Sequence, residues 1–155
     1  MKKADAETKV FKTVKHISDY DLDQQIEQLN SQFDALKTPE KLNAQKIPVI
    51  LRPAAAWNFF VVLSGMLVMR EADEGLTPFT GQLGKPFFGE RFTLKSVVDD
   101  PSLVTPRFSN EGLPAKAVTW IDHGAIKNLL ISRYYGTQKK MRANFPCNFV
   151  IPGED

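Results

Sequence analysis

The clearest periodic pattern of apolar and polar residues lies between Asp21 and Lys37. Apolar side chains recur there every three or four residues, which places them on one stripe of a helix. The stripe consists of Leu22, Ile26, Leu29, Phe33 and Leu36. Asp19 or Asp21 can cap the start of this helix, and Thr38-Pro39 would end it. We therefore predict an amphipathic helix packed on a core. The stripe is shorter than the three or four heptads, roughly, that a coiled coil needs.

Two apolar runs follow this helix. The run from Lys46 to Pro53 is short and bounded by prolines, which predicts a buried strand. The run from Pro53 to Met69 begins with a proline suited to the first turn of a helix, and three alanines follow it. It is shorter than the ~20 apolar residues that a membrane-spanning helix needs. Because it is apolar nearly all round, it predicts a buried core helix.

The chain after Gly75 is rich in Gly, Pro, Phe, Thr and Val, which is typical of short strands and turns. Phe92, Leu94 and Val97 are candidates for inward-facing positions. Asp122-His123-Gly124 lies between two apolar runs and predicts a tight hairpin turn, with glycine at positive φ.

Two later segments complete the pattern. Residues 125–135 predict a strand that becomes helical, and a helix ended by Gly136 is the alternative. The final NFPCNFVIPGED, from Asn144 to Asp155, predicts another short strand with proline and glycine stops. The fold class is therefore α+β, with an amphipathic helix and a buried apolar helix packed on a mostly antiparallel sheet.

Composition adds limits on location and partners. The 155 residues are 43% hydrophobic and 25% charged, which is ordinary for a globular protein of about one domain. We expect a flexible or solvated segment over residues 1–20 and a single α+β domain over 21–155. A net charge of +2 predicts no nucleic-acid or membrane partner. The basic start lacks a following apolar segment, so we expect no signal peptide. A single cysteine excludes an internal disulfide and fits the cytoplasm.

The residues that carry chemistry are few and scattered. His16, His123 and Cys147 are the soft metal ligands, and none is paired at the spacing of a metal site. We expect a solvated His16, an exposed His123 in its turn, and Cys147 as a small apolar filler. Asp99 and Asp100 are read as turn-formers rather than catalytic carboxylates. The residues alone predict no metal, no cofactor and no active site.

The order of several motifs carries a resemblance. The stretches are PVILRPAAAWNFF, GLTPFTGQLGKPF, FTLKSVVDDP, SNEGLPAKAVTWIDHGAIKNLLISRYYG and CNFVIPGED. In this order they resemble the TldD/PmbA family, metallopeptidase-related proteins that also carry the name modulator of DNA gyrase. The resemblance covers about residues 47–155. Members of the family are longer, with an α/β domain before this part and more β structure after it. The resemblance thus implies a fragment or reduced homologue, with exposed apolar surface and a tendency to self-associate.

The same resemblance indicates where the family's catalytic zinc motif would lie in this chain. In the catalytic branch of the family, the apolar helix carries a His-Glu-x-x-x-His motif whose histidines bind zinc and whose glutamate acts as general base. The resemblance places these three functional positions at Val61, Val62 and Met66. A valine cannot bind zinc or move a proton. The family's third zinc ligand, a cysteine, lies beyond the end of this chain, and Cys147 does not stand for it.

The resemblance therefore implies a non-catalytic TldE/PmbA-type subunit or fragment, with no metal and no cofactor of its own. Its partner would be a motif-bearing TldD-type subunit or a second copy of itself, and the complex would act on unfolded peptides. This chain would contribute interface and strand edges that hold peptide by β-addition. One alternative is a stand-alone structural or peptide-binding module with no peptidase role. Another is an active metallopeptidase with His16, His123 and Cys147 as unusual ligands.

Overall fold

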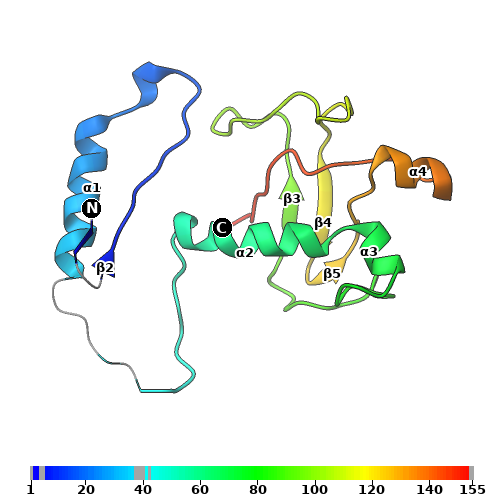
Figure 1. The fold of residues 1–155 in the computed structure, drawn as a ribbon, viewed down its shortest axis with the longest axis horizontal. Helices are drawn as coiled ribbons and strands as arrows, with labels where there is room; N and C mark the ends of the chain where they lie inside the picture. Colours follow the sequence, from blue (N-terminus) through cyan, green and yellow to red (C-terminus); the bar gives the residue numbers. More distant parts are fainter. Residues whose placement is uncertain (1, 4–5, 37–40, 42, 154–155) are drawn as a thin grey trace. The chain divides into compact units, whose positions relative to one another are not determined.

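The structure is a computed structural model that describes residues 2–3, 6–36, 41 and 43–153. The chain forms two compact units, Met1–Trp57 and Asn58–Asp155. Helices and a three-stranded antiparallel sheet confirm the predicted α+β class (Figure 1). Among the described helices, none has the length and apolar character needed to cross a membrane. The predicted division into residues 1–20 and a single domain over 21–155 stays a prediction, which limited proteolysis would test.

The first unit holds one long helix. Its elements are β1 (Lys2–Lys3), β2 (Ala6–Glu7), a 3-10 turn (Ile17–Asp19) and α1 (Leu22–Ala35), and β1 pairs antiparallel with β2. The helix predicted from the stripe is confirmed, and Asp21 rather than Asp19 is its cap. The Asp21 carboxylate accepts a hydrogen bond from the Gln24 N–H at 3.0 Å, which satisfies one of the free donors of the first turn. Thr38-Pro39 lies outside the described residues.

Burial in the first unit is lower than the sequence predicts. Leu22 and Ile26 on the stripe of α1 are 59% and 46% exposed, while Leu29 is half-buried. The prediction of a buried strand over Lys46–Pro53 is wrong: the segment forms no strand, and Ile50 is 97% exposed. A strand is buried only where neighbours pair with its backbone and cover its faces. The described part of this unit supplies no such neighbours to the run.

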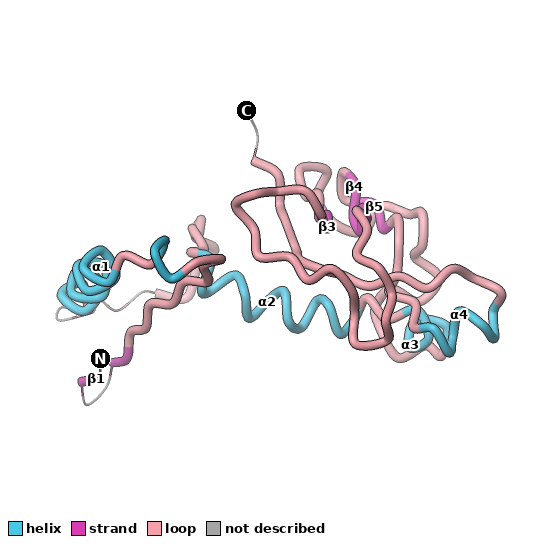
Figure 2. The backbone as a smooth tube through the Cα atoms, turned by 90° about the horizontal axis from the view of Figure 1, so that it is seen from above, coloured by secondary structure: helices cyan, strands magenta, loops and turns pink. Residues whose placement is uncertain are grey.

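The second unit contains the sheet and most of the helical turns. Its elements are the greater part of α2 (Pro53–Met66), then α3 (Met69–Asp73), β3 (Leu94–Ser96), β4 (Val118–Asp122), β5 (Ala125–Ile126) and α4 (Arg133–Lys139). The sheet order is β3-β4-β5, and both pairings are antiparallel. The later turns of α2 run across one face of this sheet, while α3 and α4 lie together at one end (Figures 1 and 2).

The predicted hairpin turn is confirmed. β4 and β5 are joined by His123 at φ 45° and Gly124 at φ 78°. Two central residues at positive φ make the primed turn whose twist matches that of the paired strands. Residues 125–135 also follow the predicted order, since β5 comes first and α4 begins at Arg133. Gly136 lies inside α4 rather than at its end, and the helix ends at Lys139 with Lys140, at φ 57°, as its C-cap.

The core of the second unit is built around β4. Its buried members are Leu67, Ala72, Phe79, Leu94, Trp120, Ile121, Ile126 and Leu129. Leu94 is fully buried, as its predicted inward position requires, and Phe92 packs against the cluster. The Trp120 indole N–H donates to Ser96 Oγ at 2.9 Å, and that hydroxyl donates to the Asn148 carbonyl at 2.6 Å. The polar atoms in this core are thus paired, which avoids the cost of burying them alone.

The last segment lies beside β3 without forming the predicted strand. It makes one antiparallel bridge, in which Lys95 and Val150 exchange two backbone hydrogen bonds of 3.0 and 2.8 Å. Next to this bridge the side chain of Asn148, instead of a backbone segment, makes the hydrogen bonds to β3's continuation. Val97 N–H donates to Asn148 Oδ1 at 2.9 Å, and Asn148 Nδ2 donates to the Val97 carbonyl at 2.8 Å. Pro146 and Pro152 supply no N–H, so a longer ladder cannot form here.

Acidification is expected to weaken the contact between α3 and α4. The Tyr135 hydroxyl donates to Asp73 Oδ2 at 2.5 Å, and Lys139 Nζ lies 3.4 Å from the same oxygen. The Tyr135 hydrogen bond, followed by Lys139, lowers the pKa of Asp73 below its ordinary 3.8. A lowered carboxyl pKa stabilises the fold above 3.8, and this stabilisation is lost as the pH falls through the lowered pKa.

The check is urea unfolding of the wild type and of Tyr135→Phe between pH 6 and pH 2. The wild type should lose stability faster than the variant below pH 3.8, by a small margin because the Asp73 side chain is 36% exposed. Parallel curves for the two proteins in that window would contradict the assignment.

Candidate functional site

The helix that carries the predicted motif positions has two different sides. Phe60 and Leu63 pack against the core, and Leu67 just after the helix is buried. Around the rest of its circumference the helix exposes Phe59, Val61, Val62 and Met66, which are 64%, 50%, 57% and 37% exposed, and this exposed apolar surface is called here the outer face of α2. This corrects the prediction of a buried helix. Apolar residues all round a helix imply burial all round only where other elements cover every side, and the sheet covers one.

The positions that the resemblance assigns to the motif all belong to the outer face. Val61, Val62 and Met66 are within the second unit, on turns of α2 where Ser64 Oγ donates back to the Val61 carbonyl at 2.8 Å. Zinc in proteins takes thiolate, imidazole and carboxylate ligands, and these three side chains offer none. Across the described residues, no group of three or more His, Cys, Asp or Glu side chains is placed to hold a metal ion.

The other candidates from the sequence belong to different elements of the chain. Cys147 is buried, with its thiol 3.6 Å from the Val97 carbonyl, and burial raises the pKa of that thiol. A raised pKa lowers the thiolate fraction, so the group is a poor nucleophile and fits the predicted apolar filler. His123 is exposed in the β4–β5 turn, and His16 is exposed before the 3-10 turn of the first unit. Asp100 is a turn-former, as predicted, since its Oδ1 accepts the Ser102 N–H at 2.8 Å.

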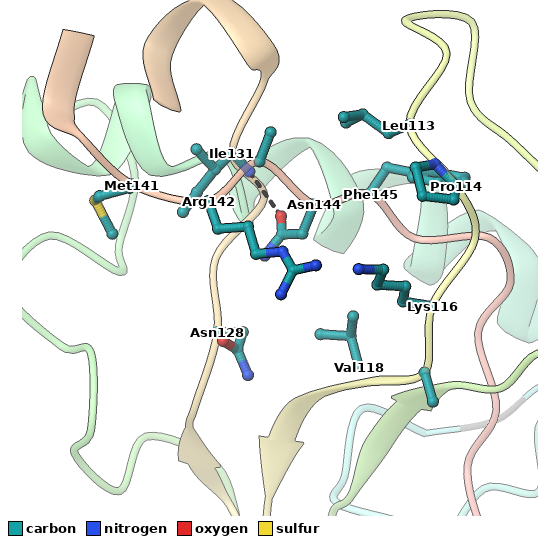
Figure 3. Close-up of a pocket in the computed structure, with 12 residues that line it drawn as sticks. Leu113, Pro114, Lys116, Val118, Asn128, Ile131, Met141, Arg142, Asn144 and Phe145 are labelled. Carbon is teal, nitrogen blue, oxygen red and sulfur yellow. Dashed lines mark hydrogen bonds between the residues drawn. The ribbon is translucent and has the colours of Figure 1, made fainter. Parts of the chain in front are cut away.

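A pocket of about 520 Å³ lies in the second unit, between the start of β4 and the segment after α4 (Figure 3). Three stretches line it: 113–118, 128–131 and 141–145. Asn144 holds two of them together, because it accepts the Ile131 N–H at 2.9 Å and donates to the Leu129 carbonyl at 3.2 Å. Asn128 Nδ2 donates to the Thr119 carbonyl of β4 at 2.7 Å. The pocket therefore rests on a hydrogen-bonded frame.

Two cationic side chains distinguish this pocket from a plain apolar hollow. Lys116 and Arg142 come from different walls and point toward one another across it (Figure 3). No motif or periodic pattern in the sequence marks these two residues. They are far apart along the chain, lie in irregular segments, and look individually like ordinary surface residues. Only the fold of residues 113–118 beside 141–145 brings them together.

Comparisons with known proteins agree with the fold. The family model for the PmbA/TldA metallopeptidase C-terminal domain matches residues 44–147. A crystal structure from Thermotoga maritima, described as a "putative modulator of a DNA gyrase", is similar to 89% of this chain with a TM-score of 0.79 and 19% identity. A second such protein, from Bacteroides thetaiotaomicron, is similar to 66% of the chain with a TM-score of 0.55 and 17% identity. At these identities the structures support the fold alone.

The match is to a part of longer proteins. This chain spans 35% of the Thermotoga protein and 24% of the Bacteroides protein. No curated protein sequence matches it significantly. The family model nevertheless covers well over half of the 155 residues, including α2, the whole sheet and α4. The chain therefore belongs to the family of the PmbA/TldA metallopeptidase C-terminal domain, the TldD/PmbA family.

Proposed function

We propose that this chain is a non-catalytic, TldE/PmbA-like subunit or fragment of a TldD/PmbA-type metallopeptidase complex that acts on unfolded peptides. Its partner in this proposal is a subunit that carries the His-Glu-x-x-x-His motif, and the complex is cytoplasmic. Membership of the family supports the link to peptidases. The single cysteine supports a reducing compartment.

The observation that carries the proposal is the outer face of α2. This face carries Val61 and Met66 at the positions that the resemblance assigns to the two histidines, and Val62 at the position of the glutamate. Each of the three side chains is at least a third exposed. These side chains cannot activate water, which supports a non-catalytic role. Contiguous exposed apolar side chains on a folded unit are typical of interaction sites, because association removes them from water. A helix without metal ligands at these places and with an exposed apolar face is suited to an interface.

The experiment is co-purification of the tagged full chain from its native lysate, with the recovered proteins identified by mass spectrometry. We expect a relative bearing the His-Glu-x-x-x-His motif in near-equal amount. Val62→Arg should abolish this recovery, because it places a charge in the centre of the outer face. Leu76→Arg is the matched control, since Leu76 is 71% exposed on the same unit and lies outside that face. Recovery of the chain alone would leave a stand-alone module as the better description.

Metal analysis tests the non-catalytic part of the proposal separately. We expect less than stoichiometric zinc in the purified chain and no peptidase activity without the partner. Stoichiometric zinc would favour the active metallopeptidase with His16, His123 and Cys147 as ligands. In that case His123→Ala should remove both the metal and the activity. The burial of Cys147 speaks against this outcome.

The idea of β-addition receives less support from the fold. The edge of β3 is bridged at Lys95 by Val150, and the edge of β5 is bridged at Ala125 by Pro86. Backbone groups that already have partners offer no template for an incoming strand. A peptide held by this chain would therefore need a different site.

A further inference from the structure

The pocket shown in Figure 3 has the composition of a binding site for an amphipathic anion. Its volume of about 520 Å³ lies within the range of roughly 300–1,000 Å³ that is usual for ligand pockets. Its apolar lining consists of Leu113, Pro114, Ala117, Val118, Ile131, Met141, Ala143 and Phe145. The polar lining is Lys116, Asn128, Arg142 and Asn144, with no carboxylate among the lining residues.

The two cations of the pocket have no anionic partner in the described part of the chain. Neither Lys116 nor Arg142 takes part in any ion pair found there. Two like charges that point at one another across a hollow repel, and an anion placed between them is attracted by both. Arg142 adds geometric preference, because its planar guanidinium matches a carboxylate with two parallel hydrogen bonds.

The apolar walls narrow the class of anion. An inorganic ion would leave the surfaces of Val118, Met141 and Phe145 in contact with water. A ligand that carries an apolar group next to its carboxylate would cover them and gain the free energy of burial. The last residue of a peptide has this arrangement, since its side chain and its terminal carboxylate are attached to the same carbon. Capture of a chain terminus by fixed polar groups is an established mode of peptide recognition.

We propose that this pocket binds the C-terminal carboxylate of a peptide whose last side chain is apolar. The carboxylate lies between Lys116 and Arg142, and the last side chain packs against the apolar wall. The inference rests on the proposed function for the peptidic nature of the ligand, and it adds which end of a peptide this chain holds. It also supplies a peptide site that the bridged sheet edges do not.

The test is binding of a fluorescein-labelled pentapeptide that ends in leucine with a free carboxylate, followed by fluorescence anisotropy with the full chain. The same peptide with an amidated C-terminus should bind at least about tenfold more weakly, because charge-assisted hydrogen bonds are lost. Arg142→Gln and Lys116→Gln should each weaken binding of the free acid by about tenfold or more. Lys85→Gln removes the same charge from an exposed residue outside the pocket and should leave binding unchanged.

Three results would overturn the inference: equal binding of the acid and amide peptides, an equal loss in Lys85→Gln, or tighter binding of phenyl phosphate than of the peptide. The last would make this a phosphate site. Both pocket cations are exposed, so their variants should fold, which circular dichroism would verify. Failure here is distinct from failure of the proposed function, because recovery of the motif-bearing partner depends on Val62 of the outer face. Arg142→Gln should leave that recovery intact.

Discussion

Replacement of Gly124 by alanine is expected to lower the free energy of unfolding of the second unit by about 3 kcal/mol or more. Two separate costs add at this position. Gly124 has φ 78°, a conformation that costs an L-residue roughly 1–2 kcal/mol. A Cβ atom there would also collide with the Phe88 carbonyl and lie 2.8 Å from the Gly89 carbonyl oxygen. Both obstacles are backbone, so relief requires the 88–89 segment to move.

That segment is held where it is by the turn itself. The Gly124 N–H donates to the Phe92 carbonyl at 2.8 Å, and the Gly124 carbonyl accepts from Phe87 and Phe88 at 2.9 Å each. A shift of residues 88–89 would therefore stretch the hydrogen bonds that attach this loop to the β4–β5 hairpin. The close approach of two backbones, more than the positive φ alone, explains why the position requires glycine.

Gly75→Ala is the matched control for this prediction. Gly75 has nearly the same φ of 77°, but a Cβ added there meets nothing within 4 Å. Gly75→Ala should therefore lower the free energy of unfolding only by the cost of the positive φ, about 1–2 kcal/mol. Urea unfolding followed by Trp120 fluorescence in a Trp57→Phe background would measure both variants. Equal losses for Gly75 and Gly124 would contradict the collision and leave only backbone strain.

The elements that could be predicted from the sequence are those decided within a few residues. Asp122-His123-Gly124 specifies its own turn, and Asp21 caps α1 through a hydrogen bond to a residue three positions away. Such signals do not depend on the rest of the fold. The strand expected over Lys46–Pro53 depends on neighbours that pair with it, and apolar character alone does not supply them.

The candidate site likewise combines features set by the local sequence with features that depend on the whole fold. The absence of metal ligands at Val61, Val62 and Met66 is a property of the sequence, while the exposure of these side chains depends on which side of α2 the sheet covers. The pocket is still less local, since Lys116 and Arg142 meet only after residues 113–118 and 141–145 have packed beside one another. Asn144 fixes the 141–145 segment against another wall of the pocket through its hydrogen bonds to residues 129 and 131, and no periodic pattern marks it.

The two tryptophans provide the sharpest comparison between a core position and an exposed one. Trp120→Ala is expected to cost about 3–5 kcal/mol, because Trp120 is fully buried at the centre of the cluster around β4. Trp57→Ala should change stability by less than about 0.5 kcal/mol, since Trp57 is 56% exposed. Urea unfolding followed by far-ultraviolet circular dichroism would measure both, and a comparable loss for Trp57 would contradict the assignment of the core.

Trp120→Phe separates burial from hydrogen bonding at the same site. Phenylalanine keeps much of the apolar contact but removes the indole N–H that donates to Ser96 Oγ. Ser96 still donates to the Asn148 carbonyl, so its hydroxyl keeps one partner in the variant. The loss should therefore be smaller than for alanine, about 1–2 kcal/mol. A loss as large as that of alanine would mean that the hydrogen bond to Ser96, rather than apolar burial, supplies most of the stability that Trp120 contributes.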